Sequence, residues 1–166
     1  MHRVMLGPEV AAILREELEA LRERIIANMD AAGQTVTGKT ARSMQVEVTE
    51  TGGDTYGILT GRRAFATLER GSRPWSKQPK KVPRFFADII GEWIKNRGLE
   101  GKLNKWAVAR TIIRDGSSLY REGGRDDIYT PEIQRTLDNI GNRIIEGYRV
   151  LVTDRLNFNT TIDIKV

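Results

Sequence analysis

The sequence predicts a single-domain α+β fold in which a long N-terminal helix and three later helices pack with a small antiparallel sheet. Stretches near both ends of the chain repeat apolar residues every three or four positions, and a central stretch alternates apolar with polar residues on either side of a glycine-rich turn. The length of 166 residues suits one domain. We expect residues 1–150 to form this domain and residues 151–166 to form a C-terminal extension.

A long helix is predicted over residues 8–31. Pro8 suits the first helical turn, where its missing N–H costs little, and Gly33 is a natural stop. The apolar positions recur at spacings of three and four and therefore share one face, which consists of Val10, Leu14, Leu18, Leu21 and Ile25. Such a helix is roughly 36 Å long, which is long for a small domain.

A β-hairpin is predicted next. Met44, Val46 and Val48 alternate with polar residues, as in a strand with one buried face. Residues 50–54 are rich in turn-forming types, and residues 56–60 can run back as the second strand. Two strands alone are marginal in water, so the hairpin needs further strands or a helix packed against it.

Three more helices are predicted after the hairpin. A helical turn over residues 63–70 leads into an extended basic loop at 71–83, and helices follow from Pro83 to Arg97 and from about 102 to 115. The last helix starts with Thr130 as its cap and Pro131 at its first position. We expect its apolar face and those of the two helices before it to fill the core: Phe86, Ile89, Ile90, Trp93 and Ile94; Leu103, Trp106, Ala109 and Ile113; and Ile133, Leu137, Ile140, Ile144 and Tyr148.

Residues 157–166 alternate as a strand does. No neighbouring segment offers a partner, so we expect this strand to join the hairpin or to pair with another subunit. Its candidate assembly residues lie on one side, namely Phe158, Thr160, Ile162 and Ile164, followed by Val166.

The composition argues against most enzymatic sites. The chain has no cysteine and one histidine, His2, which argues against thiolate, Ser-His-Asp and histidine-based metal chemistry. No apolar run approaches the ~20 residues of a membrane span, and the N-terminus lacks the apolar segment of a signal peptide. We therefore expect a soluble protein with no membrane partner, no cofactor and no catalytic activity.

Residues 33–40, GQTVTGKT, match the phosphate-binding Walker A pattern. That site requires a strand before the loop and a helix after it, whereas here a helix precedes the loop and a strand follows. We therefore interpret the segment as a connection from helix to strand. The carboxylates that a metal-dependent nuclease would use show no spacing that brings them together; they are Asp54, Glu69, Asp88, Asp126 and Asp127.

Positive charge is concentrated in the segment from Arg62 to Arg84, which holds eight cations against Glu69 alone in a chain of net charge +5. Such a segment can meet DNA phosphates, an acidic protein face, or only water. Because the cations lie on a Pro-rich loop, contact with DNA would be limited to the backbone, with a tryptophan stacked on a base. The candidate contact residues are Arg62, Arg63, Arg73, Trp75, Lys77, Lys80 and Lys81.

The order of several short motifs resembles a known family. TGKTARS at 37–43 precedes the first predicted strand, FATLERGSRP at 65–74 precedes the loop, and PRFF at 83–86 opens a helix. This order, over about residues 8–145, resembles the tail-completion and head–tail joining (neck) proteins of tailed bacteriophages. WIKNRGL at 93–99, WAVAR at 106–110 and GGRDDIY at 123–129 are most similar to versions from Bacteroides-type and crAss-like phages.

The resemblance implies a non-enzymatic virion protein of the neck, made in the host bacterial cytoplasm. Copies of such proteins, six or twelve, form a ring that joins the portal to the tail and helps to seal or guide DNA. The implied partners are further copies, portal or connector proteins, tail proteins and, non-specifically, packaged double-stranded DNA. The alternatives are a nucleic-acid-binding protein that uses the Arg62–Arg84 loop and, third, a P-loop nucleotide binder.

Overall fold

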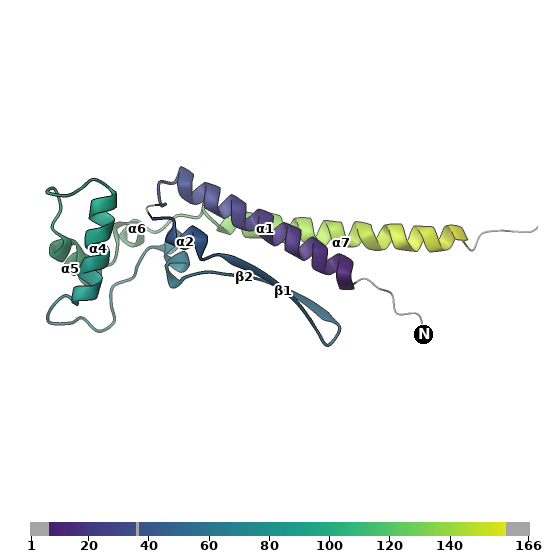
Figure 1. Ribbon diagram of the computed structural model, residues 1–166, viewed down its shortest axis with the longest axis horizontal. Coiled ribbons are helices and arrows are strands. Elements are labelled where there is room, and N and C mark those ends of the chain that lie inside the picture. Colours follow the sequence, from purple (N-terminus) through teal and green to yellow (C-terminus); the bar gives the residue numbers. More distant parts are fainter. Residues whose placement is uncertain (1–6, 36, 159–166) are drawn as a thin grey trace, which may run out of the picture.

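The computed structural model describes residues 7–35 and 37–158, with side chains described as far as Val150. The architecture is α+β, as predicted, and it is elongated (Figure 1). Helices α4, α5 and α6 gather at one end, while α1 and α7 run side by side toward the other. The elements are α1 (Gly7–Ala31), α2 (Lys39–Arg42), β1 (Gln45–Thr51), β2 (Asp54–Thr60), the 3₁₀ helix η1 (Arg63–Ala66), α3 (Thr67–Arg70), α4 (Arg84–Asn96), α5 (Lys105–Asp115), α6 (Ser118–Arg121) and α7 (Thr130–Phe158).

The main core forms where α1 covers one face of the β-hairpin, which confirms both predicted elements. The strands pair antiparallel, with Val46 opposite Leu59, so alternate residues face α1. Gly57 allows α1 to approach closely, because a Cβ there would lie 2.6 Å from Leu18 Cδ1. The buried residues of this core are Leu18, Leu21, Ile25, Met29, Met44 and Ile128.

A second, smaller core lies between α4 and α5. Ile90, Ile94 and Ala109 are buried there, and Asn104 caps α5 by accepting the N–H groups of Trp106 (2.9 Å) and Ala107 (3.2 Å). When two short helices pack only on each other, each buries only a narrow stripe of its surface in the contact. The prediction that the whole apolar face is internal is therefore wrong for the exposed residues Ile89, Trp93, Leu103 and Trp106, the last two being 41% and 44% exposed.

The prediction of a C-terminal strand is wrong where the structure describes the chain. Helix α7 is continuous across residue 150, the boundary predicted for the extension, and includes Asn157 and Phe158. Each residue added to a helix that is already formed gains a backbone hydrogen bond within the helix. A single strand gains no backbone hydrogen bonds unless another strand lies beside it. The remaining residues of that prediction, Thr160, Ile162, Ile164 and Val166, lie outside the described residues.

Candidate functional site

The segment that matches Walker A is a connection from helix to strand, as predicted. It follows α1, contains the start of the four-residue α2, and leads into β1, so no strand precedes it. Lys39 Nζ lies 2.8 Å from Glu92 Oε1 of α4, and a cleft of about 370 Å³ separates the segment from that helix. The lysine that would reach the phosphates of a bound nucleotide is thus paired with a carboxylate.

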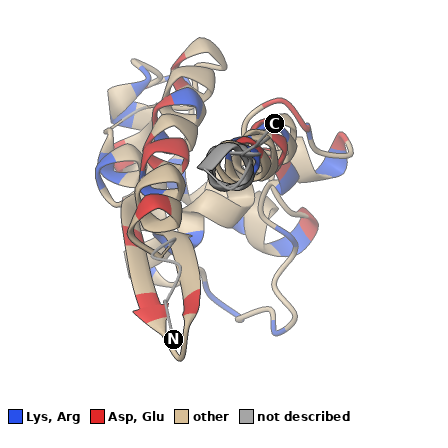
Figure 2. Cartoon of the chain, turned by 90° about the vertical axis from the view of Figure 1, so that its right-hand side faces the viewer, with Lys and Arg blue, Asp and Glu red and all other residues tan. Residues whose placement is uncertain are grey.

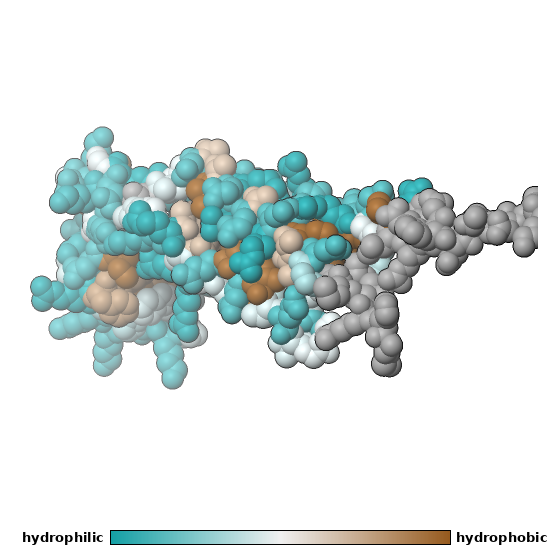
Figure 3. Space-filling model, turned by 45° about the vertical axis from the view of Figure 1, so that its right-hand side comes forward, coloured by the Kyte–Doolittle hydropathy of each residue, from teal (hydrophilic) through white to brown (hydrophobic). Residues whose placement is uncertain are grey.

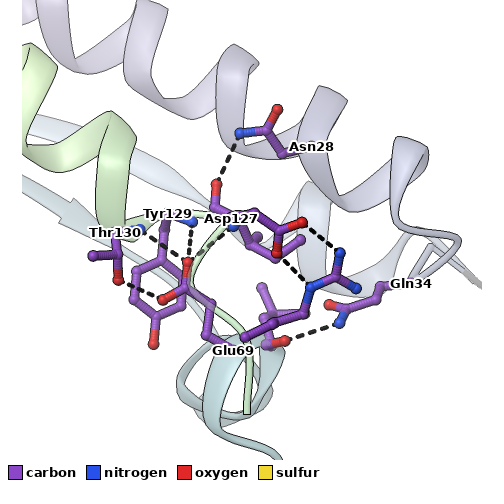
Figure 4. A network of polar contacts seen from close by, with 9 residues as sticks. Asn28, Gln34, Glu69, Asp127, Tyr129 and Thr130 are labelled. Carbon is purple, nitrogen blue, oxygen red and sulfur yellow. Dashed lines mark hydrogen bonds and ion pairs between the residues drawn. The ribbon is translucent and has the colours of Figure 1, made fainter. Parts of the chain in front are cut away.

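Glu69, a candidate metal ligand by residue type, holds the start of α7 in place (Figure 4). Its side chain is 3% exposed. Oε1 accepts the backbone N–H groups of Ile128 (2.9 Å), Tyr129 (2.6 Å) and Thr130 (2.9 Å), and Oε2 accepts the Thr130 hydroxyl at 2.5 Å. Thr130 is the first residue of α7, so the prediction that it caps the helix is wrong, and Glu69 performs that role from another element.

The environment of Glu69 stabilises its ionised form. Burial raises the pKa of this carboxyl. The hydrogen bonds from Thr130, Tyr129 and Ile128 lower the pKa by more than burial raises it, so the pKa lies below its ordinary value. The positive end of the α7 dipole also favours a carboxylate at this position. The burial of this acidic side chain is therefore explained by its structural role at the start of α7.

Gly71 and Ser72 join the same packing centre. Gly71 has a φ of +68°, and a Cβ there would lie 2.5 Å from both Ser117 Oγ and the backbone nitrogen of Tyr120. Ser72 donates its N–H to Ser117 Oγ (2.9 Å), and Ser117 donates its N–H to the Ser72 carbonyl (2.9 Å). The ERGS motif at 69–72 therefore fixes α6 and the start of α7 against α3.

The other acidic candidates do not converge on a site. Asp127 pairs with Arg125 through Nε–Oδ1 at 2.5 Å, and Asp88 pairs with Lys105 at 2.8 Å. Within the described part of the chain, no group of three or more His, Cys, Asp and Glu residues is placed to hold a metal ion. In the same residues, no helix combines the length and apolar character that crossing a membrane requires.

The structure divides the predicted basic contact residues into two groups. Arg62 and Arg63 follow the hairpin, where Arg62 lines the cleft beside Lys39. The loop residues lie by α5, since Trp75 donates its N–H to the Ile113 carbonyl (2.9 Å). None of the following cations has an ion pair with a residue that the structure describes: Arg62, Arg63, Arg73, Lys77, Lys80 and Lys81.

The loop cations form an ordered surface together with α5. Arg110 donates to the Lys80 carbonyl at 3.0 Å, and Lys81, Trp106 and Arg110 line one shallow hollow. Trp75 is half-buried and packs on Phe86 with ring centroids 5.2 Å apart, whereas Trp106 is exposed. We call this the basic surface; it comprises Arg73, Lys77, Lys80, Lys81, Trp106 and Arg110.

Sequence reasoning missed Trp106 and Arg110 as surface residues. Their spacing of four on a helix places them on one face, but the apolar pattern assigned Trp106 to the core. Only the packing of the loop along α5 brings both beside the cations of residues 73–81.

The opposite charge lies on the hairpin. Residues 7–60 carry 9 acidic and 5 basic side chains, whereas residues 61–115 carry 5 acidic and 14 basic ones. Between Gln45 and Thr60 there is no Lys or Arg, and Figure 2 shows the hairpin marked only by acidic residues. We call this part the acidic hairpin; its charges are Glu47, Glu50 and Asp54, each exposed and without an ion pair to a described residue.

Helix α7 contacts α1 through polar groups. Arg24 Nε lies 2.7 Å from Glu132 Oε2 and its Nη2 donates to Thr136, while Arg143 reaches Glu17 at 3.0 Å. Asn139 also donates to Glu17 (3.2 Å). The residues of α7 that face α1 are therefore Glu132, Thr136, Asn139 and Arg143.

Each residue of the predicted apolar face of α7 up to Ile144 follows directly after one of these α1-facing residues. One residue corresponds to a rotation of about 100° around the helix, so the apolar face is turned away from α1 by about that angle. It consists of Ile133, Leu137, Ile140, Ile144 and Tyr148, and we call it the apolar stripe. The prediction that it fills the core is wrong for Ile133, Leu137 and Tyr148, which are 42%, 57% and 46% exposed, whereas Ile140 and Ile144 are partly buried. Figure 3 shows hydrophobic side chains reaching the surface along the long-helix half of the molecule.

Comparison with known proteins identifies no relative: no family model matches the sequence, and neither a curated protein nor a solved structure is significantly similar to the chain.

Proposed function

We propose that this chain is a non-enzymatic structural protein that assembles with further copies into a ring, as a component of a tailed-phage neck between the portal and the tail. The observation that carries the proposal is the exposed apolar stripe of α7. The helix turns Glu132, Thr136 and Asn139 toward α1. It leaves Ile133, Leu137 and Tyr148 of the stripe exposed, while Ile140 and Ile144 are partly buried.

Exposure of the stripe leaves burial free energy unused. Burying an Ile or Leu side chain fully is worth about 1.5–3 kcal/mol, so each half-exposed member leaves roughly 1 kcal/mol to be gained on contact with another chain. Within the part of the chain that the structure describes, neither edge of the two-stranded hairpin pairs with a further strand, which is a second feature that favours association. Neither feature needs a ligand or a reactive group.

The assignment to a phage neck is supported by the resemblance of the ordered motifs at residues 37–43, 65–74 and 83–86 to neck proteins. In the fold these motifs occupy structural positions: the connection into β1, the packing centre around Glu69 and the start of α4. Such positions fit residues that shape an assembling subunit.

The experiment compares the wild-type chain with Leu137→Glu by native mass spectrometry and negative-stain electron microscopy, alone and with the portal and tail proteins of the same phage. We expect wild-type rings with masses in multiples of 18.8 kDa and their loss in Leu137→Glu. Asn142→Glu, which places the same charge on an exposed position on another side of α7, should assemble normally. Wild-type protein that stays monomeric in every mixture would contradict the proposal.

A second candidate function, nucleic-acid binding, is favoured by the run of residues 70–87, which contains six cations and no acid. Exposed cations attract phosphates through counterion release, with affinity that falls steeply with salt. Gel retardation of duplex DNA across a salt series tests it. Changing Arg73, Lys77, Lys80 and Lys81 together to Ala should abolish both the retardation and its salt dependence if this function holds.

A further inference from the structure

The basic surface and the acidic hairpin are complementary in charge, yet neither forms an ion pair with a residue that the structure describes. The basic surface offers the cations Arg73, Lys77, Lys80, Lys81 and Arg110, and the acidic hairpin offers Glu47, Glu50 and Asp54 with no cation between Gln45 and Thr60. Opposite potentials on two patches of one molecule steer copies of that molecule together.

The two surfaces also match in apolar character. Trp106 is exposed beside the cations, and Tyr56 and Ile58 are about half exposed on the hairpin face that points away from α1. Glu47 and Asp54 lie on this face, whereas Glu50 lies on the side of α1 near the turn. Aromatic residues and arginine are enriched at the centres of protein interfaces, whereas Lys and Glu are tolerated at the rim. The basic surface and the acidic hairpin therefore have the charge and apolar composition expected of two surfaces that bind each other.

We propose that the basic surface of one copy docks on the acidic hairpin of the next copy. The contact joins two different patches and is therefore heterologous, and it closes into a ring when the rotation between neighbours permits. This inference rests on the proposed ring function and specifies its subunit contact.

A second copy fits these observations better than a nucleic acid does. DNA would engage the cations but would leave the acidic hairpin without a partner. The aromatic ring of Trp75, the tryptophan within the loop, is half-buried and packs on Phe86. A neighbouring copy satisfies both surfaces at once.

The test reverses each charge set in the full chain. The loop variant combines Lys77→Glu, Lys80→Glu and Lys81→Glu, and the hairpin variant combines Glu47→Lys, Glu50→Lys and Asp54→Lys. A control variant combines Lys95→Glu, Lys102→Glu and Arg135→Glu, which gives the same charge change as the loop variant at exposed positions elsewhere. Assembly is followed by sedimentation velocity and native mass spectrometry under the conditions in which the wild type assembles.

Each variant alone presents like charges across the contact, so we expect its concentration for half-assembly to rise at least about tenfold. An equimolar mixture of the two should recover assembly, because the acidified loop then meets the basic hairpin and the other pair keeps its natural charges. The two variants should alternate in rings of even copy number, which their mass difference reveals. Recovery in the mixture also demonstrates that both variants are folded. The control should assemble as the wild type does.

Three results would overturn the inference. Undiminished assembly of either variant alone removes the contact but leaves the proposed ring function intact. An equimolar mixture that does not recover assembly also removes the contact. If, in addition, the loop variant alone no longer retards duplex DNA in a gel, the basic surface is assigned to nucleic acid. A wild-type chain that never assembles, with or without portal and tail proteins, removes the ring function itself.

Discussion

Glu69 and Thr130 are joined twice, because one carboxylate oxygen of Glu69 accepts the backbone N–H of Thr130 at 2.9 Å and the other accepts its hydroxyl at 2.5 Å. The two residues are 61 positions apart. A side chain of the short helix α3 therefore supplies the N-terminal cap of α7 and fixes where the longest helix of the chain begins.

Replacing Glu69 should destabilise the fold strongly. Glu69→Ala leaves three backbone N–H groups and a hydroxyl without their acceptor, and we expect a loss of about 3 kcal/mol in the free energy of unfolding. Glu69→Gln keeps an acceptor oxygen but loses the charge, and should cost about 1–1.5 kcal/mol. Urea denaturation followed by circular dichroism measures both, with the exposed Glu100→Gln as the control. Equal stability of Glu69→Ala and wild type would contradict the capping role.

The same carboxylate should make stability depend on pH. Because the pKa of Glu69 is lower in the folded chain than its ordinary value of 4.5, its stabilisation is complete above that value and is lost as the pH falls through the folded pKa. Wild type should therefore lose more stability than Glu69→Gln between neutral pH and about pH 3. Thermal unfolding across a pH series checks this, and parallel curves for the two proteins would show that another group is responsible.

Gly71 should tolerate no side chain. Gly71→Ala combines a strained backbone at φ +68° with a Cβ 2.5 Å from Ser117 Oγ and the Tyr120 nitrogen, and we expect a loss of about 3 kcal/mol or more. Gly98→Ala is the matched control, since Gly98 has a φ of +63° with open space around it. That control should cost only about 1 kcal/mol. Melting temperatures of the two variants measure the difference, and similar values would mean that crowding at Gly71 contributes nothing.

Lys39 should be dispensable. Lys39→Ala removes an exposed ion pair to Glu92, which is worth about 0–1 kcal/mol, so folding and assembly should be unaffected. Magnesium and ATP should not raise the melting temperature of the wild type. A rise that disappears in Lys39→Ala but persists in Glu92→Ala would restore the P-loop interpretation.

Local signals were sufficient to predict most elements. The apolar spacing in residues 8–31 defines α1, and the alternation from Met44 with the turn at residues 50–54 defines the hairpin, because both patterns follow from the repeat of the backbone itself. The basic loop between Gly71 and Pro83 was also predictable, since prolines and glycine exclude regular structure there. The prediction failed at Asn157 and Phe158, which belong to α7.

The sequence by itself determined the helical and extended segments, the apolar side of each helix and the clustering of positive charge. Only the tertiary structure decided which of those sides are covered. A repeat of 3.6 residues shows that Ile133 and Leu137 share a face, but the contacts of Arg24 and Glu17 with the neighbouring face of α7 decide that this apolar face stays open. Glu69 as a cap and Trp106 beside Arg110 likewise arise from segments that meet only in space, because such contacts leave no periodic trace along the chain.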